Sequence, residues 1–207
     1  MSGANAVSNL APLLSLEQWA ALAEDEPGEL VDGRLVDEEM PNVIHELIVG
    51  WLLAALRAWA VPRGGLVLGS ETKLAVAPGR GRKPDVAVYL PGSRKPPGRA
   101  SLVYEPPSLV VEIVSTRARD GRRDRIEKVG EYARFGVLYY WLVDPQLLTL
   151  EVLVRSAEGA YVHALGATEG VVSAVPGCEG LALDLDGLWA EVAALDDENE
   201  GGAAPPR

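Results

Sequence analysis

The stretch SLVVEIVS, residues 108–115, decides the fold because it reads as a strand that is buried on both faces. The residues that flank Glu112 are apolar at both alternating positions, so neither face of the strand is expected to meet water. A carboxylate inside such a run is costly unless it binds a cation or accepts several hydrogen bonds. The alternative is a half-exposed strand from which Glu112 points to solvent.

Further strand-like runs lie on both sides of this segment. Each is short, rich in Val and Leu, and separated from the next by Gly, Pro or charged loops. The runs before it are 64–70, 71–77 and 84–90, and those after it are 137–144, 147–155 and 160–166. We expect all of them to belong to one sheet.

Helical spacing of apolar residues predicts a long helix from Asn42 to just before Pro62, and a further helix over 119–134. Because strands lie on both sides of the second helix, we expect a mixed central β-sheet flanked by helices, of class α/β or α+β.

The N-terminal part predicts two small elements. Ser15 and Gln18 form the pattern of a capping box, which indicates a short helix over about 15–24. Asp32 and Gly33 lie between two short alternating runs, and this dipeptide accepts the positive φ angles of a two-residue hairpin turn. We therefore expect an N-terminal helix followed by a hairpin.

Length and composition predict one domain. A chain of 207 residues with 48% hydrophobic content can form one substantial core. Polar and small residues predict disorder over 1–12 and in the acidic, Pro/Gly-containing tail 195–207, which leaves a domain over 13–194. Without a long uninterrupted apolar segment or a signal sequence, and with Cys178 as the one cysteine, we expect a cytoplasmic protein with no membrane contact and no disulfide.

The charge is unevenly distributed along the chain. The net charge is −11, yet residues 57–134 hold 16 of the 19 Lys and Arg and 8 of the 30 Asp and Glu, a local +8 that leaves −19 for the rest. A basic centre of this kind fits a local anionic partner such as DNA. The alternative is that these residues form ordinary solvated helix faces and loops.

Asp85 is the second candidate acid. It stands at the head of the strand run 84–90, directly after Pro84, so its carboxylate is expected at a strand edge. Two carboxylates on neighbouring strands would form the hard, oxygen-rich site that suits Mg²⁺ or Mn²⁺. Such an ion promotes phosphodiester hydrolysis by polarising a phosphoryl oxygen and activating water. Taken alone, Asp85 could equally be a turn residue.

Asp124, Lys128 and Tyr132 recur at four-residue intervals and so share one face of the predicted helix 119–134. From that face Lys128 could reach the sheet and stabilise charge on a phosphate or orient water. The alternative is an ordinary ion pair between Lys128 and Asp124, one helical turn apart.

Four segments, in order and spacing, resemble the bacterial Uma-two type family of restriction-endonuclease-like proteins, within the PD-(D/E)XK nuclease superfamily. They are KPDVAVYL, PPSLVVEIVS, the D-x3-K-x3-Y face and FGVLYYWLVDP, and the resemblance extends over about 15–192. It implies a restriction endonuclease-like core in which Asp85 and Glu112 bind a divalent metal. Val114 stands at the superfamily lysine position, and the resemblance implies that Lys128 substitutes for that lysine.

The resemblance also implicates Glu29 and His45, which match positions where the family tends to carry a polar residue near the site. An acid such as Glu29 would complete the metal shell. Structural or capping roles for Glu29 and His45 are the alternative.

Three functions follow as hypotheses from these residues. The first is a Mg²⁺- or Mn²⁺-dependent endonuclease acting on DNA, with a homodimer expected because cutting two strands usually takes two active sites. The second is a non-catalytic module of the same fold that binds DNA or protein, suggested by Val114 and by the acidic ends of the chain. The third is hydrolysis of a small phosphorylated metabolite in the same acidic pocket.

Overall fold

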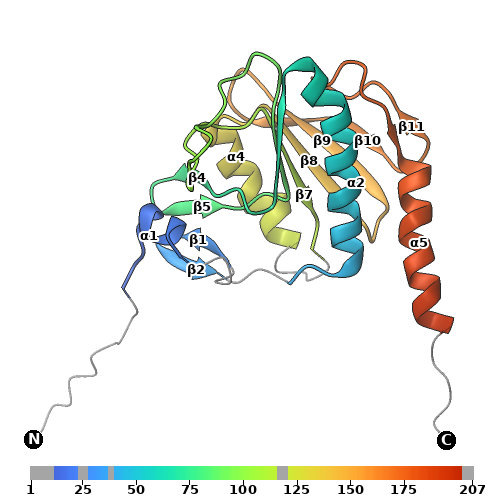
Figure 1. The fold of residues 1–207 in the computed structure, drawn as a ribbon, viewed down its shortest axis with the longest axis horizontal. Helices are drawn as coiled ribbons and strands as arrows, with labels where there is room; N and C mark the ends of the chain where they lie inside the picture. The colour runs from blue at the N-terminus through green and yellow to red at the C-terminus, as the bar shows by residue number, and fades with distance from the viewer. Residues whose placement is uncertain (1–11, 23–27, 37–39, 116–120, 202–207) are drawn as a thin grey trace, which may run out of the picture.

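The structure is a computed structural model that describes residues 12–22, 28–36, 40–115 and 121–201 (Figure 1). The disorder predicted for 1–12 falls, apart from Pro12, outside the described residues, and so does the part of the predicted tail that begins at residue 202.

A six-stranded mixed sheet forms the centre of the molecule (Figure 1). Its order is β10 (Tyr161–Ala167), β9 (Thr149–Arg155), β8 (Tyr139–Asp144), β7 (Leu109–Ile113), β6 (Val86–Tyr89) and β3 (Leu66–Gly69). β7 lies inside the sheet, antiparallel to β6 and parallel to β8, and all five of its residues are buried. The expected strand at 108–115 is therefore confirmed as a buried one.

A separate four-stranded sheet forms the N-terminal side, so the prediction of one sheet was wrong. Its order is β2 (Arg34–Val36), β1 (Glu29–Val31), β5 (Arg80–Arg82) and β4 (Leu74–Ala77). β4 lies within the run 71–77 but pairs with β5, whose sequence RGR lacks the apolar alternation of a strand. The hairpin prediction is confirmed, since Asp32 and Gly33 take φ angles of 51° and 75° between β1 and β2.

Helix α2 (Val43–Ala60) begins after Asn42, whose side chain caps the first turn through the amide of His45. Figure 1 shows it lying along the central sheet, with α5 (Leu185–Gly201) beside it. Its buried residues join the larger core cluster, which also holds Val111 and Ile113 of β7. The long predicted helix is confirmed.

Together with the following 3-10 turn η1 (Val61–Arg63), α2 forms a helical segment of 21 residues that is long and apolar enough to cross a membrane. Its most apolar 18-residue window has a mean hydropathy of 1.5. This is weak support for a membrane span, because the core helix of a globular domain has the same composition. Here Ile48, Leu52 and Leu56 of α2 are buried against the sheet, which accounts for its apolar character.

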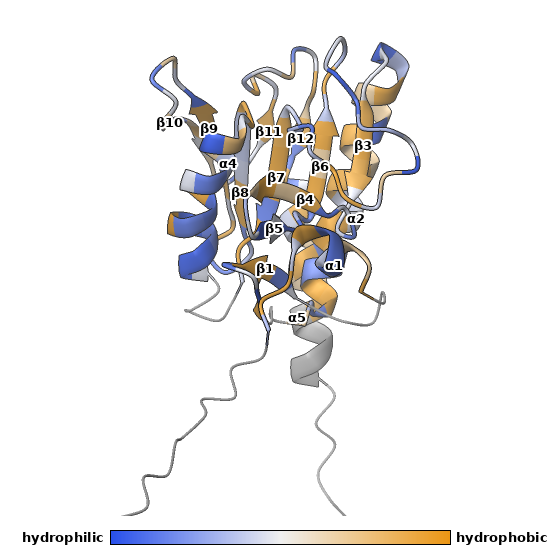
Figure 2. Cartoon of the chain, turned by 90° about the vertical axis from the view of Figure 1, so that its left-hand side faces the viewer, coloured by the Kyte–Doolittle hydropathy of each residue, from blue (hydrophilic) through white to orange (hydrophobic). Residues whose placement is uncertain are grey.

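The segment between β7 and β8 is helical, as predicted, but not uniformly so. Residues 123–128 form a π-helix, η2 (Arg123–Lys128), which passes into α4 (Val129–Phe135). α4 lies over the face of the sheet that carries Val110 and Val114, opposite α2. Figure 2 shows the strands largely in orange, with blue residues on the outer surface of the helical segment. Because side chains alternate along a strand, Glu112 shares the α4 face with Val110 and Val114.

The first and last helices of the described chain differ in length from the predictions. The capping box of Ser15 and Gln18 is present, but α1 (Leu16–Ala20) is shorter than the predicted 15–24. At the other end β11 (Val171–Val172) pairs with β12 (Leu183–Asp184), and α5 continues to Gly201. The helix thus extends past residue 194, into the segment where disorder was predicted.

Candidate active site

Glu112 is buried in β7, and both of its carboxylate oxygens have protein partners. Lys128 Nζ lies 2.9 Å from Oε2, and the hydroxyl of Tyr132 donates to Oε1 at 2.7 Å. The solvent-facing alternative for Glu112 is therefore wrong, since its exposure is 3%. The hydrogen bonds satisfy the carboxylate, which meets one of the two conditions under which a buried acid is tolerated.

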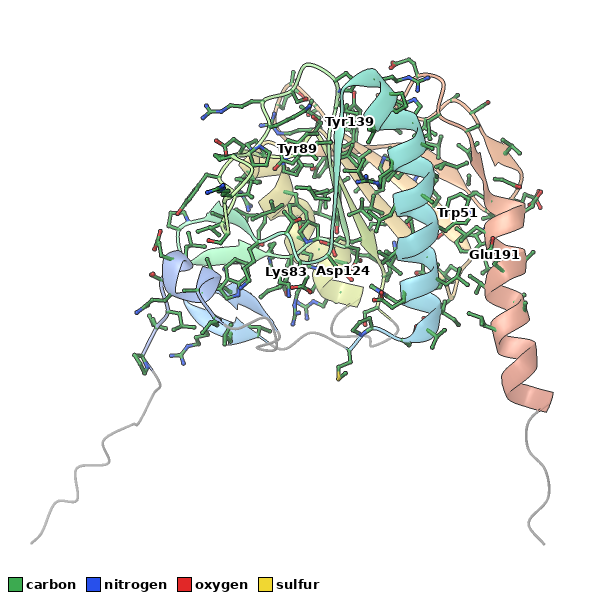
Figure 3. All side chains as sticks on the ribbon, viewed as in Figure 1. Trp51, Lys83, Tyr89, Asp124, Tyr139 and Glu191 are labelled. Atoms are coloured by element: carbon green, nitrogen blue, oxygen red, sulfur yellow. The ribbon has the colours of Figure 1, made fainter. Side chains whose placement is uncertain are left out.

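Lys128 lies at the junction of η2 and α4, where the helix turns its side chain toward the sheet. Besides Glu112, its Nζ lies 3.1 Å from Asp124 Oδ1 and 3.5 Å from Glu29 Oε1. The one-turn ion pair with Asp124 is thus present, but as part of a larger buried cluster. Figure 3 shows Asp124 and Lys83 at one end of the central sheet, near the first turns of α2.

Asp85 directly precedes β6 and lies at the same end of the sheet. Its Oδ2 accepts a hydrogen bond of 2.7 Å from the backbone amide of Ile113, the residue after Glu112. Its Oδ1 lies 3.1 Å from Nε2 of His45, in the first turn of α2. Asp85 thus bridges β7 and α2, and the geometry brings His45 to it rather than to Glu112.

Glu29 reaches the cluster from β1 and is fully buried. Its Oε2 pairs with Arg82 of β5 at 2.5 Å, and its Oε1 accepts from the amide of Lys83 at 3.1 Å. Glu29 therefore joins the second sheet to Lys128, and part of its role is structural.

Arg82 and Glu131 belong to the same network, although the sequence did not single them out. Arg82 is fully buried between Glu29 and Glu131 of α4, and Arg80 also pairs with Glu131. The sequence did carry one signal for Glu131. It lies three residues after Lys128, and this spacing places two residues on the same face of a helix. For Arg82 we find no such signal, because its burial follows from the pairing of β5 with β1.

The electrostatics of the cluster are dominated by buried acids. Burial raises the pKa of Glu112 well above its usual range, and the charges of Asp85, Asp124 and Glu29 add to that rise against the opposing effect of Lys128. Burial alone would also raise the pKa of Glu29, but Lys128 and Arg82 outweigh it and lower that pKa.

For Lys128, burial opposes the charged form, yet Glu112, Glu29 and Asp124 outweigh it and raise the pKa. Lys128 is therefore an ammonium ion among more acids than it can neutralise. An excess of buried negative charge of this kind is relieved by a proton or by a bound cation.

Asp85 and Glu112 supply the oxygen ligands that a hard cation prefers. Within the described ranges, no group of three or more His, Cys, Asp or Glu side chains is arranged to hold a metal ion. Mg²⁺, however, is commonly bound by one or two carboxylates and completed by water and substrate phosphate, so a two-acid set fits its chemistry. Asp85 and Glu112 thus suit Mg²⁺ or Mn²⁺. No observation in the described residues supports Glu29 as a third protein ligand of such an ion.

Val114, which the sequence resemblance aligns with the lysine position of the nuclease superfamily, is 7% exposed and packs in the apolar cluster that contains Tyr132 and Tyr140. The buried ammonium beside Glu112 comes instead from Lys128, on the helical segment that follows β7. The positive charge thus reaches the acid from a different element.

Many of the basic residues between 57 and 134 are paired with acids of the same chain. Pairs form between Arg80 and Asp32, Arg82 and Glu29, Lys83 and Glu71, Arg94 and Glu105, and Arg125 and both Asp144 and Glu151. These contacts, some buried and some at the surface, already balance part of the local positive charge. The charge left for an anionic partner is smaller than the sequence count indicates.

The mixed central sheet, covered by α2 on one face and by α4 on the other, has the restriction endonuclease-like fold. A family model described as Uma2, putative restriction endonuclease, matches residues 14–186. The chain therefore belongs to the Uma2 family of putative restriction endonucleases.

A solved structure supports the same fold. It is a putative nuclease belonging to DUF820 from Anabaena variabilis ATCC 29413, which is similar to this chain with a TM-score of 0.69 and 18% sequence identity. The match covers 86% of this chain and 98% of that one. No curated protein gave a significant match.

Proposed function

We propose that the protein is a Mg²⁺- or Mn²⁺-dependent endonuclease that hydrolyses phosphodiester bonds of DNA at the site around Asp85, Glu112 and Lys128. Membership of the family and the shared fold support a nuclease-type function. The observation that carries the more specific proposal is the 2.9 Å contact between Lys128 Nζ and Glu112 Oε2 on the strand next to Asp85. Three elements thus bring two acids and an ammonium to one end of the sheet.

Asp85 and Glu112 would hold the metal ion, which supplies charge stabilisation for the phosphate and lowers the pKa of water. The protein's own groups prepare this site. Tyr132 fixes one oxygen of Glu112, while the Ile113 amide and His45 fix the two oxygens of Asp85. Both carboxylates are therefore oriented before substrate arrives, which is the condition for electrostatic preorganisation.

Lys128 would donate a hydrogen bond to a phosphate oxygen or to the attacking water. In the reaction the water oxygen forms a bond to phosphorus, one phosphoester bond breaks, and the leaving oxygen gains a proton. The ammonium stabilises the negative charge that builds on the phosphate during this exchange. Its raised pKa keeps it charged across the working pH range.

The test is plasmid nicking by purified full-length protein with Mg²⁺ or Mn²⁺. We expect cleavage with the metal, none after chelation with EDTA, and a loss of about 10²-fold or more in Asp85→Asn, Glu112→Gln and Lys128→Met. Glu158→Gln, at an exposed turn distant from the cluster in sequence, is the matched control for a lost carboxylate and should cut like the wild type. Equal cleavage by the wild type and an Asp85→Ala, Glu112→Ala double variant would refute the proposal.

The second candidate is a non-catalytic module of the same fold that acts by binding DNA or protein. It is favoured by one specific observation, namely that both oxygens of Glu112 and both of Asp85 already have protein partners. This candidate predicts a mobility shift of DNA at low salt without cleavage. Binding through phosphates would weaken steeply as salt rises.

A further inference from the structure

The helical turn that carries Lys128 has a rare geometry. η2 is a π-helix, whose hydrogen bonds span one residue more than those of an α-helix. Isolated π-turns are uncommon and occur frequently at functional sites. Because the wider turn rotates the residues on either side of it relative to each other, the direction of Lys128 depends on this geometry. Such a conformation persists only where surrounding contacts hold it.

Arg125 provides the first of these contacts. Its guanidinium contacts two strands: Nη2 lies 2.7 Å from Asp144 Oδ2 at the end of β8, and Nη1 lies 2.7 Å from Glu151 Oε1 in β9. Arg125 lies on the π-helix only three residues before Lys128. Arg125 therefore fixes the turn to β8 and β9. These two strands follow β7, the strand that carries Glu112.

Tyr140 provides the second contact. Its hydroxyl, buried in β8, donates to the backbone carbonyl of Asp124 at 2.9 Å. A backbone carbonyl in a π-turn is displaced from the hydrogen-bond pattern of an α-helix. A side chain that donates to such a carbonyl helps to hold the irregular turn. Two independent contacts thus hold the same turn, one from Arg125 of η2 to β8 and β9 and one from Tyr140 of β8.

We propose that Arg125 is a positioning residue, which holds the π-helical turn on β8 and β9 so that the Lys128 ammonium stays directed at Glu112. Arg125 acts on Lys128 through the helix, because its guanidinium contacts Asp144 and Glu151 rather than Glu112, Asp124 or Glu29 around the ammonium. An effect of Arg125 on cleavage rests on the proposed function. The placement of Lys128 by Arg125 can be measured without any cleavage assay.

The first readout is chemical labelling of lysines in the folded full-length protein. Acetic anhydride acetylates exposed lysines fast and buried, ion-paired lysines slowly, and peptide mass spectrometry reports each site. Lys95, which is exposed, is the internal reference for Lys128, which is buried. We expect Arg125→Gln and Tyr140→Phe each to speed Lys128 labelling relative to Lys95 about tenfold or more, because the turn opens more often.

Two further variants make the readout specific. Arg125→Lys keeps the charge but can reach only one of the two acids, so its labelling should fall between wild type and Arg125→Gln. Arg122→Gln removes an exposed positive charge from the preceding turn and should leave Lys128 labelling unchanged. Thermal unfolding of each variant shows whether it is folded. If Arg125→Gln does not fold, labelling of Tyr140→Phe tests the proposal in its place.

Cleavage kinetics give the second readout. We expect Arg125→Gln to lower kcat about tenfold with KM close to wild type, since the ammonium acts on the transition state, and Arg125→Lys to restore part of the loss. Wild-type labelling of Lys128 in both Arg125→Gln and Tyr140→Phe would overturn the proposal. Faster labelling with unchanged kcat would support the positioning of Lys128 by Arg125 and contradict a role of Lys128 in cleavage. If the wild type cuts no DNA, the proposed function fails, and the labelling result still decides whether Arg125 positions Lys128.

Discussion

At the scale of single residues, the surroundings of Lys128 are the most consequential, because one ammonium meets Glu112, Asp124 and Glu29 in the interior. Removing one partner of a buried ion pair leaves an uncompensated charge, and this costs more than the pair contributes. The residue that we place at the proposed reaction is thus also a structural one. A loss of cleavage in its variants has to be read together with their stability.

Lys128→Met tests this double role. We expect the free energy of unfolding at neutral pH to fall by about 3 kcal/mol. Because Lys128 lowers the pKa values of Glu112, Asp124 and Glu29, its loss raises all three in the folded state. The folded protein then binds protons more readily than the unfolded chain, so the lost stability is regained as pH falls and the loss grows as pH rises. Urea unfolding at pH 5 and pH 8 measures both effects. Lys95→Met, at an exposed site, should change stability by no more than about 0.5 kcal/mol.

Cys178 offers a second prediction at this scale. Burial raises the pKa of its thiol to about 12, so the reactive thiolate is scarce at ordinary pH, and the side chain is fully buried. We expect Ellman's reagent to leave the folded protein unmodified at pH 8 and to titrate one thiol after denaturation in guanidinium. Rapid reaction of the folded protein would contradict the buried placement.

At the scale of secondary structure, local sequence pattern predicted those elements that are apolar in themselves. β7, β8 and α2 carry enough apolar residues at the right period to be recognised one at a time. β5 was missed because its Arg and Gly residues gain their strand conformation from pairing with β1 and β4.

The same contrast explains which parts of the candidate site were predictable. Lys128 and Tyr132 follow from helical spacing, whereas the π-form of η2 depends on Arg125 partners 19 and 26 residues away. The burial of Glu29 depends on Arg82, which is 53 residues away. Contacts of this range have no local signature, so the acids could be proposed from the sequence but their supporting partners could not.

The contact between α1 and β5 gives a prediction at the scale of elements. A Cβ added at Gly81 would lie 2.2 Å from the ring of Trp19, which is buried beneath β5. We expect Gly81→Ala to lower the free energy of unfolding by about 1–3 kcal/mol through overpacking. Gly50→Ala is the matched control, because nothing lies within 4 Å of its added Cβ inside α2, and it should stabilise the protein by about 0.5–1 kcal/mol. Thermal unfolding distinguishes the two signs.

At the scale of the whole molecule, Arg82 joins the N-terminal sheet to the helix over the central sheet through Glu29 and Glu131. We expect Arg82→Met to cost about 3–5 kcal/mol, since two buried carboxylates, Glu29 and Glu131, each lose one charged partner. Arg80→Met, two residues away and 30% exposed at its side chain, should cost no more than about 1 kcal/mol. Similar losses in both variants, measured by urea unfolding, would show that the buried network does not join the two parts.

The net charge of −11 also acts at this scale, since many arginines and lysines already pair with acids of the same chain. We expect DNA affinity to be modest and to depend on few phosphate contacts. Plotted against the logarithm of salt concentration, log K should fall with a slope shallower than about −4, corresponding to four or fewer neutralised phosphates. Fluorescence anisotropy with a labelled duplex measures this slope, and a slope as steep as that of a protein with many phosphate contacts would contradict the structure.

The candidate site draws on β1, the start of β6, β7 and η2, elements that span residues 29 to 128 of the chain. Its contacts are therefore of high sequence separation, and such contacts form late because loop closure precedes them. A ribosome-bound or proteolysed chain that lacks any one of these elements has no assembled site. Under the proposed function, this topology would protect the host's DNA from half-made chains, and refolding chains should regain cleavage only after the sheet has closed.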